Sequence, residues 1–221
     1  EESIDASVAV MAVGWMANAE LLNLEAAGVA LDQRGFIEVD EYLQTNVPHI
    51  YAAGDINGKL MLVSTSSNEG YYAASNAVEG LKYPVHYDLI PMGSFTDPEY
   101  AQIGLTEARA RESYDVLVST VDFGDYPRSI IDGRPTGFCK MVVEKKSGEI
   151  LGCHVVGERA VETVQLVAAG MKAGLTVKQL AELPLSFPTY VAIVSWAAYE
   201  IVEQMGLDTG VPRWLRHPKK Q

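Results

Sequence analysis

The hydrophobic pattern of the first 84 residues begins with a near-continuous apolar run over residues 6–14. Such a run is typical of a parallel strand that is buried on both faces, and a strand of this kind needs neighbours on both sides. A helical pattern follows over residues 18–28 and places Gly28 where a helix C′ residue would stand. Because no partner strand precedes the run and the chain begins without Met, we expect a fragment of a longer polypeptide.

The pattern then predicts two short strands and one long helix. Residues 36–40 alternate between apolar and polar side chains as a half-buried strand does, after a turn at 33–35. A second apolar strand, residues 49–53, runs directly into Gly54-Asp55. A helix rich in small residues is expected from about Leu62 to Glu79.

From about residue 86 to 203 the pattern changes to strands followed by helices, which is typical of an α+β domain. Strands are expected at 100–105, 116–121, 137–144 and 149–157, and the last two should pair as a hairpin across the turn at 146–148. Helices are expected at about 160–173, 176–183 and 189–204. The second of these helices opens with a Thr-x-x-Gln capping box.

Composition narrows the class of protein. The formal net charge of −12 argues against a nucleic-acid or anionic-membrane surface, because binding phosphates needs clustered Lys and Arg. No apolar run approaches the length of a membrane span, and the pattern predicts no signal peptide, so we expect a cytoplasmic protein without a membrane partner. Residues 213–221 are locally basic, and the tail at 207–221 is interpreted as solvated, with a weak partner-binding arm as the alternative.

Cysteine and histidine spacing predicts no metal site. Cys139 and Cys153 lie far apart in the sequence, without CxxC or CxxxxC spacing, so neither a zinc site nor a redox-active disulfide is indicated. Both stand in apolar strand-like runs and are interpreted as ordinary buried thiols. The four histidines are scattered without metal-ligand spacing.

Asp55 is the strongest candidate for a binding residue. An ionised carboxylate accepts charge-assisted hydrogen bonds from the hydroxyls of a ribose or ribityl chain. Gly54 before it lets the backbone turn without a Cβ clash, and the helix that starts after Leu62 directs free N–H groups and a positive dipole end toward a ligand. Taken alone, the same pattern also fits a turn Asp that caps a helix.

The flanking segments favour the binding interpretation. They resemble, in order and spacing, the FAD-dependent pyridine nucleotide–disulfide oxidoreductases, the superfamily of dihydrolipoamide dehydrogenase, glutathione reductase and mercuric reductase. The resemblance covers about 200 residues. Its segments are Val13-Gly14, residues 31–40, residues 44–55 and the Gly-Glu-Arg-Ala run at 157–160.

That resemblance implies a fold and a cofactor. The fold would be α/β plus α+β: the end of the FAD/NAD(P) fold with its two dinucleotide-binding domains, followed by an α+β C-terminal dimerisation domain with an antiparallel sheet. Residues 1–16 would end the NAD(P)-binding domain, 17–85 would form the C-terminal half of the FAD-binding domain, and 86–206 the interface domain. Gly54, Asp55 and the backbone at Met61, Leu62 and Val63 would contact FAD.

The parent enzyme would carry hydride from NAD(P)H to FAD and form a homodimer through the C-terminal domain. Its acceptor would be a small molecule or a disulfide. No GxGxxG fingerprint occurs in the 221 residues, so we expect the chain alone neither to bind FAD tightly nor to turn over.

One departure from the family limits this interpretation. Disulfide-reducing members begin the last helix with His-Pro and place a Glu five residues after the His, and the pair serves as general acid and base. Phe187 and Ala192 stand at those two positions here, and neither side chain can move a proton. Tyr190 is a weak substitute donor, or a core-packing aromatic.

Two alternatives to a disulfide reductase therefore stay open. Soluble transhydrogenase-like enzymes, which have no redox disulfide, resemble this chain in the Gly-Glu-Arg-Ala run and in an aromatic-Pro-Thr run. A non-catalytic dimerisation module is the other alternative, favoured by the missing His–Glu pair and opposed by the intact Gly54-Asp55 motif.

Overall fold

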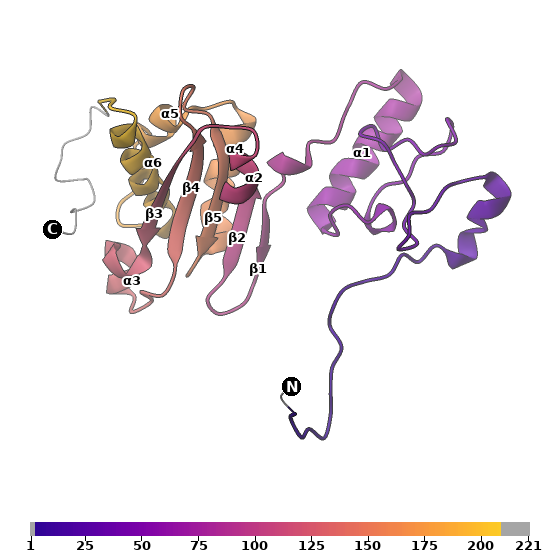
Figure 1. The fold of residues 1–221 in the computed structure, drawn as a ribbon, viewed down its shortest axis with the longest axis horizontal. Coiled ribbons are helices and arrows are strands. Elements are labelled where there is room, and N and C mark those ends of the chain that lie inside the picture. Colours follow the sequence, from indigo (N-terminus) through magenta and orange to yellow (C-terminus); the bar gives the residue numbers. More distant parts are fainter. Residues whose placement is uncertain (1–2, 209–221) are drawn as a thin grey trace. The chain divides into compact units, whose positions relative to one another are not determined.

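The computed structural model describes residues 3–208, and the chain divides into two compact units, Glu1–Tyr87 and Asp88–Gln221 (Figure 1). Most of the predicted tail, from residue 209 onward, lies outside the described part. None of the described helices combines the length and apolar character that crossing a membrane requires.

The first unit contains one long helix, α1 (Val63–Glu79), at the predicted place. The helix begins after the extended residue Leu62 and is followed by Gly80, whose φ of 88° lies outside the helical region. The unit's other helical elements are short 3-10 turns: η1 (Glu20–Leu22), η2 (Leu24–Ala27) and η3 (Asp55–Asn57).

The helix predicted over residues 18–28 is therefore wrong in type. It is two 3-10 turns, because Asn23 between them adopts a left-handed conformation with φ of 50° and interrupts the α-helical hydrogen bonding. Gly28 does end the second turn, with φ of 72°, and its N–H bonds back to the carbonyl of Glu25. The expected strands at 36–40 and 49–53 are reduced to isolated bridges, Leu31↔Ile37 and Gln44↔Tyr51.

The apolar run at residues 6–14 is neither a strand nor buried, which corrects the prediction for this segment. Val10 and Val13, for example, are 84% and 85% exposed. A single extended segment gains burial and backbone partners only from neighbouring strands, and the described chain places none beside it. The core of this unit is correspondingly small, with Val29, Ile37 and Ala52 at its centre.

The second unit is built on an antiparallel five-stranded sheet in the order β1-β2-β5-β4-β3 (Figure 1). Neighbours β4 and β5 form the hairpin that the turn at 146–148 predicts. The strands are β1 (Met92–Ser94), β2 (Tyr100–Gly104), β3 (Val116–Asp122), β4 (Phe138–Glu144) and β5 (Ile150–Val156).

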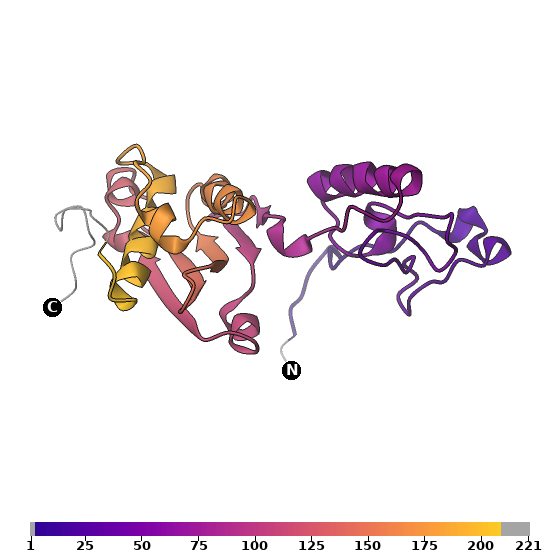
Figure 2. The same cartoon turned by 90° about the horizontal axis from the view of Figure 1, so that it is seen from above.

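Helices cover this sheet unequally. The large core lies between one face of the sheet and the helices α4 and α6, with α5 packed against α6, and Figure 2 shows α4 (orange) and α6 (yellow) on that side. A smaller cluster around Val142 and Leu151 lies on the opposite face, under α2. The helices are α2 (Glu107–Arg111), α3 (Pro127–Ile131), α4 (Ala160–Lys172), α5 (Val177–Ala181) and α6 (Ile193–Gln204).

Local sequence signals explain where these helices begin. Thr176 and Gln179 form both hydrogen bonds of the predicted capping box at the start of α5. Thr106 caps α2 by accepting the backbone N–H of Arg109. The α4 helix starts at Ala160, the last residue of the Gly-Glu-Arg-Ala run.

Candidate functional site

The Gly54-Asp55 turn lies beside the first turn of α1, as the sequence predicts. Gly54 has φ of 85° and ψ of −161°, a combination that is essentially confined to glycine. Asp55 opens the 3-10 turn η3 and its side chain is exposed. Its Oδ1 accepts only a long hydrogen bond, 3.5 Å, from the hydroxyl of Ser66, so the carboxylate keeps capacity to accept bonds from a ligand.

The N-terminus of α1 carries no side-chain cap. Leu62 at the N-cap is extended, and the first N–H bonded within the helix is that of Ser66, which donates to the carbonyl of Leu62 at 2.9 Å. The preceding N–H groups of the first turn are therefore free of intrahelical partners and mark a positive end of the helix dipole. Val63 is 87% exposed, whereas Met61 and Leu62 are partly buried.

Thr65 adds a buried polar atom to this helix end. It is the third residue of α1, its side chain is fully buried, and its Oγ1 has no hydrogen-bond partner among the described residues. A buried hydroxyl without a partner is uncommon in folded proteins and costs free energy.

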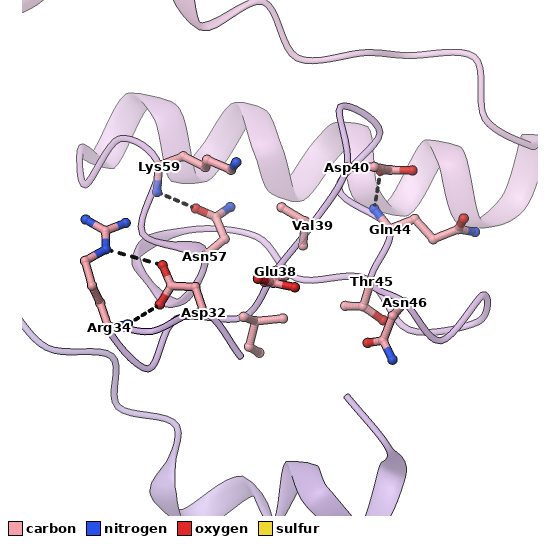
Figure 3. A pocket seen from close by; sticks show the side chains of 11 residues that line it. Asp32, Arg34, Glu38, Val39, Asp40, Gln44, Thr45, Asn46, Asn57 and Lys59 are labelled. Carbon is pink, nitrogen blue, oxygen red and sulfur yellow. Dashed lines mark hydrogen bonds and ion pairs between the residues drawn. The ribbon is translucent and has the colours of Figure 1, made fainter. Parts of the chain in front are cut away.

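The first unit also contains a hollow of about 570 Å³, shown in Figure 3. None of the predicted cofactor residues lines it. Asp32 at one end accepts the backbone N–H groups of Arg34 and Phe36 at 2.8 and 3.0 Å, and these bonds, the Phe36 one foremost, lower the pKa of Asp32. The lining is Asp32, Arg34, Ile37, Glu38, Val39, Asp40, Gln44, Thr45, Asn46, Asn57 and Lys59.

In the second unit, the residues predicted to replace an acid/base pair lie around the start of α6. Phe187 is 54% exposed, and Ala192 is buried at the end of the 3-10 turn η6 (Tyr190–Ala192). The loop between them is held by Tyr126, whose hydroxyl donates to the carbonyl of Thr189 at 2.8 Å.

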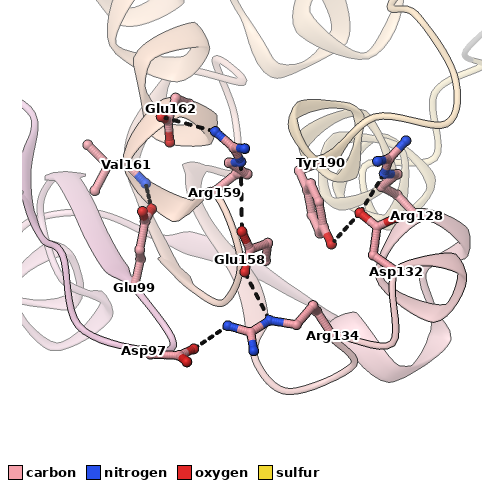
Figure 4. A network of polar contacts seen from close by, with 10 residues as sticks. All are labelled: Asp97, Glu99, Arg128, Asp132, Arg134, Glu158, Arg159, Val161, Glu162 and Tyr190. Carbon is pink, nitrogen blue, oxygen red and sulfur yellow. Dashed lines mark hydrogen bonds and ion pairs between the residues drawn. The ribbon is translucent and has the colours of Figure 1, made fainter.

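Tyr190 is a packed residue whose hydroxyl is already engaged. Its side chain stacks on Phe123 with ring centroids 6.1 Å apart, and the residue is 9% exposed. Its hydroxyl donates to Oδ2 of Asp132 at 3.0 Å, and the same oxygen accepts from Arg128 at 2.8 Å (Figure 4). Burial, followed by the bond to Asp132, raises the pKa of Tyr190 to about 12, so the phenol stays protonated at neutral pH.

A second polar network surrounds the start of α4 (Figure 4). Arg134 bonds to Asp97 and to Glu158, the latter at 3.0 Å, and Arg159 pairs with Glu158 and Glu162. The adjacent hollow measures about 130 Å³. Every positive charge in this group already faces a carboxylate, so the network is interpreted as a support for the loops rather than as an anion site.

The two cysteines lie closer together than their sequence spacing suggests. Cys139 on β4 and Cys153 on β5 are buried thiols whose Sγ atoms are 3.9 Å apart. The hydrogen bond to Cys153, together with burial, raises the pKa of the Cys139 thiol and disfavours a reactive thiolate. Within residues 3–208 no cluster of His, Cys, Asp and Glu side chains could hold a metal ion.

Sequence reasoning found the Asp55 turn but missed what supports it. Glu69 accepts a hydrogen bond from Gly54 of this turn, and Tyr87 donates to Glu69. Asp132 accepts from the hydroxyl of Tyr190. None of the residues Glu69, Tyr87 and Asp132 belongs to a motif. The available signal for Glu69 is its position: an acidic residue on the inner side of a helix otherwise lined there by small side chains.

Two family profiles match this chain. The profile described as pyridine nucleotide-disulphide oxidoreductase, dimerisation domain, matches residues 90–198, and the profile described as pyridine nucleotide-disulphide oxidoreductase matches residues 1–70.

Individual relatives agree with these profiles. A mercuric reductase of Bacillus cereus is 38% identical over 81% of this chain and 28% of its own length. A dihydrolipoyl dehydrogenase of Mycobacterium bovis is 38% identical over 85% of this chain and 41% of its own length. The chain thus spans well under half the length of these relatives.

Solved structures of similar fold agree with the family profiles. LpdA from Mycobacterium tuberculosis superposes with a TM-score of 0.80 and 26% identity, covering 87% of this chain and 42% of that one. The HOCl-induced flavoprotein disulfide reductase RclA from Escherichia coli gives a TM-score of 0.74 at 26% identity, covering 85% of this chain and 44% of that one.

Proposed function

This chain belongs to the pyridine nucleotide-disulphide oxidoreductase family, and from that premise we propose that it serves an FAD-dependent NAD(P)H oxidoreductase. In that enzyme its first unit would contribute flavin contacts and its second unit the dimer interface. We also propose a cytoplasmic location, in keeping with the acidic composition.

The observation that carries the proposal is the pairing of Asp55 with the open end of α1. An exposed carboxylate with a single long protein contact lies next to a helix N-terminus that has no side-chain cap. A carboxylate is the group that accepts from polyol hydroxyls, and free N–H groups with a positive dipole end favour negative charge. One ligand with a sugar chain at one end and an electron-accepting ring at the other would use both features.

The residues present fit FAD on this ground. Asp55 would accept from ribityl or ribose hydroxyls, and Gly54 would let the backbone turn beneath them. The backbone at Met61, Leu62 and Val63 would approach the ring, where the dipole of α1 would favour the reduced, more negative form. Bound there, FAD would supply the chemistry of accepting a hydride from NAD(P)H.

The second unit supports the proposal of a homodimer. Residues 90–198 match a dimerisation-domain profile, and isologous two-fold dimers are the commonest closed assembly. We propose that α4 and the residues following Pro188 lie at this interface. We also propose the domain limits expected from the sequence: 1–16 for the end of the NAD(P)-binding domain, 17–85 for the FAD-binding part and 86–206 for the interface domain.

The loop before α6 limits which electron acceptors the enzyme could reduce. A disulfide acceptor needs a group that donates a proton to the leaving thiolate. Phe187 and Ala192 cannot supply one, and the hydroxyl of Tyr190 is committed to Asp132 with a raised pKa. We therefore propose an acceptor whose reduction does not depend on a protein acid at this loop, as in a soluble transhydrogenase-like flavoenzyme without a redox disulfide.

A non-catalytic dimerisation module is the second candidate. The same two positions, Phe187 and Ala192, favour it, because they lack the acid/base pair of the disulfide-reducing members. If the chain is only a dimerisation module, Asp55 and the N-terminal turn of α1 are dispensable for its function. The flavoenzyme proposal, in contrast, makes them necessary for FAD binding.

The deciding experiment compares Asp55→Ala with Glu25→Gln in the full-length native enzyme, because the 221 residues alone are not expected to bind FAD tightly. Both changes remove one exposed negative charge from the first unit, but only the first removes the proposed sugar ligand. Titration with FAD, followed by quenching of flavin fluorescence, should show at least about tenfold weaker binding for Asp55→Ala. Equal FAD affinity in the wild type and Asp55→Ala, or no FAD binding by the wild type, would refute the proposal.

A further inference from the structure

Glu69 is the only charged side chain that is buried among residues 3–208. It lies on the inner side of α1, seven residues into the helix, and is 0% exposed. Withdrawing a carboxylate from water is costly unless hydrogen bonds replace its hydration. The position therefore calls for a full set of donors.

Three donors from two segments of the chain, the Gly54–Asn57 turn and Tyr87, meet this carboxylate. The backbone N–H of Gly54 donates to Oε2 at 2.5 Å, and Nδ2 of Asn57 donates to the same oxygen at 2.8 Å. The hydroxyl of Tyr87, the last residue of the first unit, donates to Oε1 at 2.7 Å. Among residues 3–208 no Lys, Arg or His side chain pairs with this carboxylate, so the turn and Tyr87 supply its hydrogen bonds.

Two of these donors belong to the turn that carries Asp55. Gly54 immediately precedes Asp55 and is held in a conformation that other residues avoid, and Asn57 closes the 3-10 turn η3. Asp55 itself has only the 3.5 Å contact with Ser66, so its direction is set by the backbone on either side of it. That backbone is held by Glu69.

We infer that Glu69 is the positioning residue of the Asp55 turn, clamping Gly54 and Asn57 so that the Asp55 carboxylate faces the cofactor. The inference rests on the proposed flavin function but concerns a residue that touches no ligand itself. Its effect on FAD runs through the geometry of residues 54–57, and Tyr87 holds the other carboxylate oxygen so that Glu69 cannot rotate away.

The test uses graded substitutions at Glu69 in the native full-length protein. Glu69→Leu removes every acceptor, whereas Glu69→Gln keeps an acceptor for Gly54 and can turn its amide toward the Tyr87 oxygen. Glu79 offers a matched control on the same helix, because its carboxylate also accepts from a tyrosine hydroxyl, that of Tyr83, at 2.8 Å but is exposed. Glu79→Leu and Glu79→Gln therefore make the same chemical changes away from the turn.

Two readouts are measured on each variant: amide hydrogen exchange at Gly54 by NMR and FAD affinity by fluorescence titration. Glu69→Leu should speed exchange at Gly54 by at least about tenfold and weaken FAD binding by a similar factor, since a bond to a charged acceptor is lost. Glu69→Gln should recover most of both effects, and the Glu79 variants should match the wild type. If Glu69 only filled space, Glu69→Gln would not be expected to restore slow exchange at Gly54 and FAD affinity more than Glu69→Leu does.

The outcomes separate this inference from the proposed function. Unchanged Gly54 exchange in Glu69→Leu, or faster exchange with unchanged FAD affinity, overturns the inference while leaving the flavin site intact. A wild type that binds no FAD refutes the proposed function. In that case the rate of amide hydrogen exchange at Gly54 is the measurement that shows whether Glu69 holds the turn. If Glu69→Leu does not fold, Tyr87→Phe, which releases one carboxylate oxygen, should show the same two effects at smaller size; no effect there overturns the inference.

Discussion

Replacing Tyr190 by Phe should lower stability slightly and leave catalysis unaffected. The substitution keeps the ring that stacks on Phe123 and removes only the hydroxyl that donates to Asp132 at 3.0 Å. Hydrogen bonds to charged groups contribute about 1.5 to 3 kcal/mol. The Asp132 side chain is 29% exposed and keeps its bond to Arg128, so water and the guanidinium replace part of the loss. We therefore expect a decrease of about 1 kcal/mol in the free energy of unfolding.

The difference in the free energy of unfolding between the wild type and Tyr190→Phe should change with pH in a defined direction. The pKa of Tyr190 is raised to about 12 in the folded chain from an ordinary value of 10.0, so folding favours the protonated phenol. A raised pKa contributes stability that is complete below the unfolded value and is lost as pH rises toward the folded value. The wild type should therefore lose stability between about pH 10 and 12 relative to Tyr190→Phe, and the two unfolding curves should converge.

Urea unfolding at pH 8, 10 and 11 measures both effects. Tyr114→Phe, at a more exposed tyrosine of the same unit, serves as the control and should change stability at pH 8 by less than about 0.5 kcal/mol. NAD(P)H-dependent flavin reduction and turnover are measured on the full-length native enzyme that carries the same substitutions. If Tyr190→Phe abolishes turnover while the protein stays folded, the hydroxyl is a proton donor and our assignment of Tyr190 to packing is wrong.

Two further predictions, one of them with a control substitution, test the packing of the second unit. Ile201→Ala empties a fully buried site on α6 and should cost about 2 to 5 kcal/mol in urea unfolding, whereas Ile131→Ala, 66% exposed on α3, should cost less than about 0.5 kcal/mol; equal losses would contradict the assigned core. Gly157→Ala should cost about 2 to 4 kcal/mol, because Gly157 has φ of 143° and a Cβ there would lie 2.4 Å from the Phe123 ring. A Gly157→Ala protein as stable as the wild type would show that the ring moves freely.

Most elements of the second unit could be predicted because the interactions that stabilise them are coded locally, although the short strand β1 and the short helix α3 were not predicted. The turn at 146–148 brings β4 and β5 together as a hairpin, and the Thr176–Gln179 box starts α5 where both residues occur. Alternation along β4 places Cys139 and Met141 in the large core. In each case, residues near each other in the sequence determine the outcome.

The first unit could be predicted less well because its expected strands depend on partners distant in the sequence. The run at residues 6–14 has the composition of a buried strand, yet it stays exposed without neighbouring strands. Residues 18–28 have a helical pattern that the left-handed Asn23 divides into two 3-10 turns. Among the helices and strands predicted for this unit, only α1, whose hydrogen bonds lie within the segment, formed as predicted in the described residues.

The sequence by itself determined the family, the hairpin-and-helix organisation of the second unit and the Gly54-Asp55 turn before α1, because these depend on local spacing and on residue types at fixed positions. Only the tertiary structure decided that Glu69 and Tyr87 clamp that turn, that Asp132 engages Tyr190 and that Cys139 and Cys153 lie 3.9 Å apart. These contacts join residues 14 to 58 positions apart, and no local pattern specifies which distant polar groups will meet once the chain is packed.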